Sequence, residues 1–97
     1  MRVLEKVKKL LNITSSYMDD VISLWISETV RFMVDAGVNK KVADSSYAVG
    51  VVARGVADLY DFGSGSGEFS NHFKQSVIQL SEMTEDQIKD ALNVETL

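Results

Sequence analysis

The stretch from Tyr17 to Ala36 keeps its apolar residues at helical spacing for about 20 positions, which would form a helix roughly 30 Å long. Gly37 follows at the position where a helix-ending glycine is expected. One broad face of this helix is apolar and the opposite face is polar, so the helix needs a partner for its apolar face. The residues of the apolar face are Met18, Val21, Ile22, Trp25, Ile26, Phe32, Met33 and Ala36.

Three further apolar residues of this helix, Leu24, Val30 and Val34, fall among its polar positions. Isolated apolar side chains are common on protein surfaces, so simple exposure is one explanation. A contact with a second subunit is the other, because the helix already carries a complete core face. The pattern leaves both explanations open.

A second long helix is expected over residues 46–62, where the valines do not alternate as they would in a strand. Gly50 and Arg54 lie opposite its apolar face. Gly50 and Gly55 each cost a helix about 1 kcal/mol relative to alanine, which indicates close packing against another helix of the same or another subunit. The apolar face carries Val49, Val52, Val56, Leu59 and Tyr60.

Shorter amphipathic patterns occupy residues 3–11 and 70–83, and Thr84 with Gln87 forms a capping-box pattern that opens a last helix through about Leu92. The other expected N-caps are Ser15 or Ser16 and Asp44 or Ser45. No stretch has the alternation of a strand. The sequence therefore predicts one all-α domain over residues 1–97, a small bundle of four to five helices with a long central helix pair. Residues 82–97 are expected to form a mobile C-terminal segment.

A glycine- and serine-rich stretch follows the second long helix. It comes after a helix, lacks lysine and carries an acid, so it does not fit a phosphate-binding loop. We expect a loop that is either a plain linker or a partner-binding segment. Its residues are Gly63, Ser64, Gly65, Ser66, Gly67 and Glu68.

The composition argues against several functions. The chain has 97 residues, a net charge of −4, no cysteine and a single histidine. We therefore expect no thiolate metal site, no cofactor and no enzymatic activity, and a general nucleic-acid binder would need a basic excess. The N-terminus lacks the apolar run of a signal peptide or membrane helix, so we expect a soluble, cytosolic chain without membrane contacts.

Three segments together resemble a known family. These are "KKLLNIT" at residues 8–14, "DDVISLWISETVRFMVDAGV" at residues 19–38 and "AVGVVARGVADLYDF" at residues 48–62. They resemble the head–tail connector, or adaptor, proteins of long-tailed bacteriophages. In that family an acidic turn precedes a long helix, and an alanine- and valine-rich helix ending in Leu-Tyr follows. The similarity extends over residues 3–80.

The resemblance implies a structural role without catalysis. Connector subunits form a dodecameric ring beneath the portal protein of the DNA-filled head. The ring extends the channel through which DNA passes without sequence-specific contacts, and it docks the stopper or tail-completion protein. The expected location is the head–tail interface of the virion, after synthesis in the host bacterial cytoplasm. A small helical DNA-binding regulator and an unrelated helical protein-interaction module remain the alternatives.

The resemblance and the residue pattern together give the expected contacts. Residues 63–68 would face the lumen or the next protein along the axis. The subunit-interface candidates are Leu24, Val30, Val34, Gly50 and Arg54. The portal-binding candidates are Thr84, Gln87, Ile88, Ala91 and Leu92.

Overall fold

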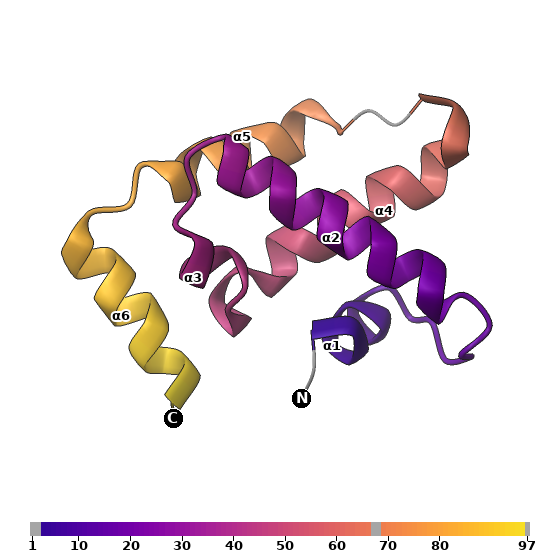
Figure 1. Cartoon of the computed structure of the whole chain (residues 1–97), viewed down its shortest axis with the longest axis horizontal. Coiled ribbons are helices and arrows are strands. Elements are labelled where there is room, and N and C mark those ends of the chain that lie inside the picture. The colour runs from indigo at the N-terminus through magenta and orange to yellow at the C-terminus, as the bar shows by residue number, and fades with distance from the viewer. Residues whose placement is uncertain (1–2, 67–68, 97) are drawn as a thin grey trace.

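A computed structural model describes residues 3–66 and 69–96, and the side chains of residues 3–60 and 69–93. Within these ranges the chain is all-helical, without strands, as predicted (Figure 1). The elements are α1 (Val3–Leu10), α2 (Asp19–Asp35), α3 (Lys40–Ala43), the 3₁₀ turn η1 (Ser46–Ala48), α4 (Val49–Ser66), α5 (Asn71–Ser81) and α6 (Glu85–Thr96).

The two longest helices, α2 and α4, form the centre of the bundle, which confirms the expected long helix pair. They run in opposite directions and cross, and α2 packs more extensively on α4 than on any other element (Figure 1). Helix α1 packs against both of them, and α5 packs against α4. The largest fully buried side chains at their junction are Ile22, Met33, Val52, Val56, Phe73 and Val77.

Both ends of α2 are set by local interactions. The predicted cap at Ser15 or Ser16 is wrong, because a turn that joins the Asp19 N–H to the Ser16 carbonyl (3.2 Å) precedes the helix and leaves Met18 at the N-cap position without a side-chain cap. At the other end Gly37 has φ +108°, as its position predicted. The Val38 N–H donates to the Met33 carbonyl at 3.0 Å, which completes a Schellman motif.

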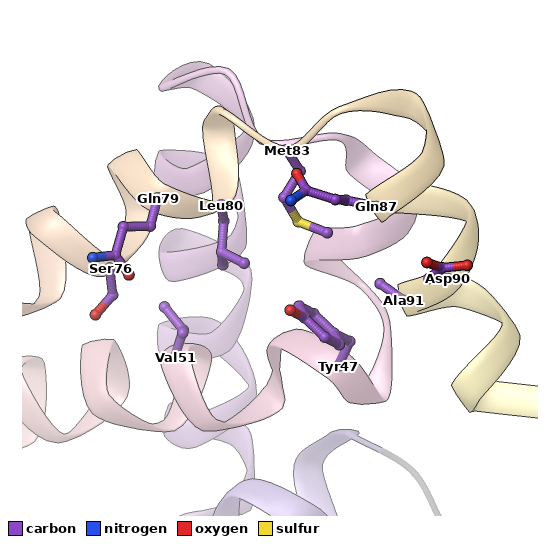
Figure 2. A pocket seen from close by; sticks show the side chains of 9 residues that line it. All are labelled: Tyr47, Val51, Ser76, Gln79, Leu80, Met83, Gln87, Asp90 and Ala91. Carbon is purple, nitrogen blue, oxygen red and sulfur yellow. The ribbon is translucent and has the colours of Figure 1, made fainter.

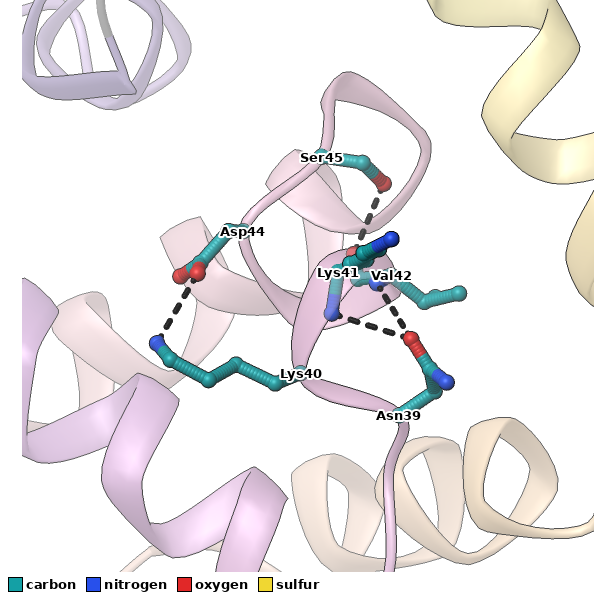
Figure 3. Close-up of polar contacts among 6 residues, drawn as sticks. All are labelled: Asn39, Lys40, Lys41, Val42, Asp44 and Ser45. Atoms are coloured by element: carbon teal, nitrogen blue, oxygen red, sulfur yellow. Dashed lines mark hydrogen bonds and ion pairs between the residues drawn. The ribbon is translucent and has the colours of Figure 1, made fainter.

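The connection between the long helices contains a helix that the sequence pattern did not predict. In α3 the Asn39 carboxamide oxygen accepts the N–H groups of Lys41 and Val42, at 2.9 and 3.2 Å (Figure 3). Val42 is fully buried, so this single turn contributes to the core.

Ser45, one of the two expected caps, lies at the N-cap position of the 3₁₀ turn η1, but neither Ser45 nor Asp44 caps this turn with its side chain, because both side chains bond backwards to α3. Asp44 pairs with Lys40 at 3.1 Å, and the Ser45 hydroxyl donates to the Val42 carbonyl at 2.7 Å (Figure 3). The 3₁₀ turn η1 that follows Ser45 has no side-chain cap.

Helix α4 continues through Ser66, so the expected loop does not begin at Gly63. Gly63, Ser64, Gly65 and Ser66 are helical, whereas Gly67 and Glu68 lie outside the described residues. Glycine costs a helix only about 1 kcal/mol per residue and, unlike proline, keeps its N–H donor, so the composition of this stretch does not forbid a helix.

The predicted start of the last helix is confirmed. The Thr84 N–H donates to Gln87 Oε1 at 2.9 Å, and the Gln87 N–H donates to Thr84 Oγ1 at 3.2 Å, the reciprocal bonds of a capping box. Helix α6 extends to Thr96, beyond the expected end at Leu92, and lies against α3 and η1. The mobility expected for residues 82–97 stays a prediction.

Candidate functional site

The crossing of α2 and α4 depends on Gly55, which confirms one of the two expected close approaches. A Cβ atom at Gly55 would lie 2.5 Å from Thr29 Cγ2 and 2.7 Å from Phe73 Cε1, closer than atoms can approach. Thr29 is fully buried, and its hydroxyl donates to the Trp25 carbonyl at 2.8 Å. The contact between Thr29 and Gly55 therefore marks the inner side of both helices.

Gly50 differs from Gly55, because a Cβ atom there would meet nothing within 4 Å. It precedes Gly55 by five residues, which places it about 140° around α4 from the crossing contact. Among the described residues, no atom outside the backbone of α4 and the two adjoining residues therefore approaches this position of Gly50 closely. Whether a second chain approaches it stays a prediction.

Leu24 holds the equivalent position on the other helix. It precedes Thr29 by five residues and therefore points about 140° away from the crossing contact. Its side chain is 59% exposed, and its neighbour Val21 is 42% exposed. We define the outer α2 surface as Asp20, Val21, Leu24 and Glu28.

A groove lies on the far side of α4, between this helix and the end of α1, with a volume of about 310 Å³. Leu10 forms part of its wall and is 57% exposed. Arg54 has no ion pair or hydrogen bond with any residue that the structure describes. We call this site the α4 groove; its lining residues are Leu10, Leu11, Gly50, Ala53, Arg54, Ala57 and Asp58.

Asp58, at one end of the groove, is engaged within the chain. Its Oδ2 accepts the backbone N–H of Ser70 at 3.0 Å and the Ser70 hydroxyl at 2.8 Å. The Ser70 hydroxyl in turn accepts the Phe73 N–H at 3.2 Å and caps α5. Asp58 thus ties α5 to α4, and Arg54 is the charged group of the groove without a partner among the described residues.

The structure separates Leu24 from the other two apolar residues that fall among the polar positions of α2. Val30 and Val34 are half-buried, pack against the core and line a second hollow between α2 and α3. Lys40 and Asp44 lie at the same hollow and pair with each other. Part of each valine therefore serves the bundle itself, whereas Leu24 remains on the surface.

A third hollow lies between α6 on one side and η1, α4 and α5 on the other, with a volume of about 470 Å³ (Figure 2). Tyr47 and Met83 line it, although the sequence pattern did not single them out. Gln87 also lines it and carries one half of the capping box. No sequence pattern could have identified Tyr47 and Met83, because they are far apart in the chain and only the tertiary fold brings them to the same hollow.

The portal-binding candidates of α6 differ in exposure. Ala91 is buried, and Ile88 and Leu92 pack against the core. Thr84 and Gln87 are exposed and hydrogen-bonded to each other. An incoming partner would therefore meet the polar side of α6 unless the helix first left the bundle.

The described residues contain no group of three or more His, Cys, Asp or Glu side chains that could hold a metal ion. His72 lies exposed near the start of α5. In the same part of the chain, no helix has the length and apolar character needed to cross a bilayer.

Comparison with known proteins gives no match: no family model, no curated protein and no solved structure is significantly similar to this chain.

Proposed function

We propose that this chain is a structural subunit that assembles into a ring at the head–tail junction of a long-tailed bacteriophage. The ring would join the portal protein to the stopper or tail-completion protein and extend the channel for DNA. The subunit would be made in the bacterial cytoplasm and incorporated into the virion. In this role it binds proteins and catalyses no reaction.

The observation that carries the proposal is the placement of two different exposed surfaces, the outer α2 surface and the α4 groove, on opposite sides of the central helix pair. Leu24 points away from α4, and Gly50 points away from α2 (Figure 1 shows the two helices crossing). A ring requires a heterologous contact, in which one surface of a subunit meets a different surface of the next. The two surfaces meet this requirement.

Two other features support the proposal. The resemblance of residues 3–80 to connector proteins includes both long helices, whose all-helical arrangement agrees with a small connector subunit. The net charge of −4 suits a channel wall on which DNA must not adhere.

The test is assembly with the portal protein encoded in the same genome. We would co-express this chain with that portal protein, purify the complex and examine it by electron microscopy and native mass spectrometry. A closed ring seated on the portal is the expected result. A chain that remains monomeric or dimeric both alone and beside assembled portal would refute the proposal.

The C-terminal candidates can be tested in the same assay. Substitution of the exposed residues Thr84 and Gln87 by serine and glutamate keeps side-chain acceptors near the helix start and changes the surface there and at the edge of the third hollow. Weaker co-purification with the portal is expected if α6 contacts it while docked. Unchanged co-purification would remove these two residues from the contact.

A further inference from the structure

We propose that the α4 groove is the binding site for the outer α2 surface of a second copy of this chain, with the neighbour's Leu24 seated over Gly50. This inference rests on the proposed function and specifies the contact that would join adjacent subunits. It concerns two surfaces that are both exposed in the single chain.

The shape of the groove suits an aliphatic side chain. Gly50 leaves its centre open, since apart from the backbone of α4 and the two adjoining residues no described atom lies within 4 Å of the position that a Cβ atom would occupy there. Ala53 and Ala57 add only methyl groups, and the exposed Leu10 provides an apolar wall. A leucine that enters this groove would bury apolar surface on both partners, which favours the contact.

The charge of Arg54 in the groove is complementary to the acidic residues of the outer α2 surface, and the other charged group of the groove, Asp58, is already hydrogen-bonded to Ser70. Arg54, one turn after Gly50, has no partner among the described residues. Asp20 and Glu28 lie one turn before and one turn after Leu24, and neither forms an ion pair within the described part of the chain. With Leu24 over Gly50, an acidic residue therefore lies near Arg54 whichever way the neighbour's α2 runs.

The arrangement favours a continuing assembly over a symmetric dimer. Each copy that offers its Leu24 to one neighbour still has an unoccupied groove for another. A contact of this kind closes into a ring when the rotation between copies permits, and otherwise extends into a filament. In a symmetric dimer the two copies would instead meet through one shared patch, which would require Leu24 and Gly50 to lie on the same side of the chain.

Disulfide cross-linking tests the contact directly, because the chain contains no cysteine. We would mix an affinity-tagged Gly50→Cys chain with an untagged Leu24→Cys chain and measure the initial rate of the mixed disulfide under mild oxidation. The control replaces the second chain by Ile78→Cys, since Ile78 on α5 is similarly exposed, at 53%. The Leu24 pair should cross-link about tenfold faster than the control pair.

Charge reversal provides a second measurement in the same assay. Adding Arg54→Glu to the Gly50→Cys chain should slow cross-linking about two- to fivefold, as expected for an exposed charge pair. Adding Asp20→Lys and Glu28→Lys to the Leu24→Cys chain should then restore the rate. A slowed reaction without restoration would refute the charge pairing.

Two results would overturn the proposed contact. One is equal cross-linking rates for the Leu24 and Ile78 pairs. The other is faster formation of Leu24→Cys homodimers than of the mixed species, which would indicate a symmetric contact. Rings on the portal without the mixed cross-link would refute only this contact, whereas the mixed cross-link without rings on the portal would refute the connector function.

Discussion

Substitution of the two α4 glycines by alanine should change the stability in opposite directions. Alanine removes the helix penalty of about 1 kcal/mol at either position. At Gly50 the new methyl group meets nothing within 4 Å, so Gly50→Ala should raise the free energy of unfolding by about 0.5–1 kcal/mol. At Gly55 the methyl group would lie 2.5 Å from Thr29 Cγ2 and 2.7 Å from Phe73 Cε1.

The overlap at Gly55 should outweigh the gain in helix propensity. Inserting a methyl group into a packed core costs about 1–3 kcal/mol, and contacts this short lie at the upper end of that range. Because Thr29 Cγ2 is attached directly to Cβ of a β-branched side chain, it cannot move aside without a shift of α2. We therefore expect Gly55→Ala to lower the free energy of unfolding by about 1–2 kcal/mol net, or roughly 5–15 °C in Tm.

Thr29→Ser supplies the matched test of this mechanism. Serine lacks the Cγ2 methyl but retains the hydroxyl that donates to the Trp25 carbonyl. The double variant Thr29→Ser/Gly55→Ala should be more stable than the sum of the two single changes predicts, by about 1 kcal/mol. Urea denaturation followed by circular dichroism at 222 nm measures the free energy of unfolding of the parent and of the four variants: Gly50→Ala, Gly55→Ala, Thr29→Ser and the double variant. The reasoning fails if Gly55→Ala is stabilised as much as Gly50→Ala.

Two further predictions concern local features. Thr84→Ala removes the hydroxyl that accepts the Gln87 N–H and should lower the free energy of unfolding by about 1 kcal/mol. Thr84→Ser retains a hydroxyl and should keep most of the stability of the parent. Equal thermal stability of the two variants would contradict the capping role. Leu24→Gln should leave the stability within about 0.5 kcal/mol of the parent, whereas Val30→Gln should cost at least about 1 kcal/mol because part of Val30 packs against the core; equal melting temperatures for this pair would contradict the distinction.

The helices could be predicted from the sequence because their signals act over one or two turns. The capping box of Thr84 and Gln87 and the glycine after α2 both rely on residues that are neighbours in the chain. The prediction was wrong at the start of α2 and in the connection that contains α3. At both places several serines, asparagines or aspartates could have capped a helix; at α2 none of them does, because Met18 holds the N-cap position, and in the connection Asn39 caps α3.

The sequence pattern identified the candidate contact residues but could not show which of them stay exposed in the folded chain. Leu24, Val30 and Val34 are equivalent by helical pattern, yet α3 packs beside the two valines and nothing covers Leu24 among the described residues. Arg54 was also a candidate, but its position in a groove depends on Leu10 and Leu11 from the end of α1. The spacing of residues within α4 could not have predicted this groove, because Leu10 and Leu11 come from another part of the chain.

The sequence by itself determined that this chain forms amphipathic helices. Both signals involve near neighbours in the chain: apolar residues three or four apart share one face of a helix, and caps are hydrogen bonds within one turn. Only the tertiary structure decided which glycine lies at the helix crossing and which remains open on the surface. Gly50 and Gly55 carry the same cost in an isolated helix, and they differ because Thr29 and Phe73, which are distant in the chain, pack against only one of them. Packing between distant residues therefore placed Leu24 and Gly50 on opposite outer sides of the helix pair.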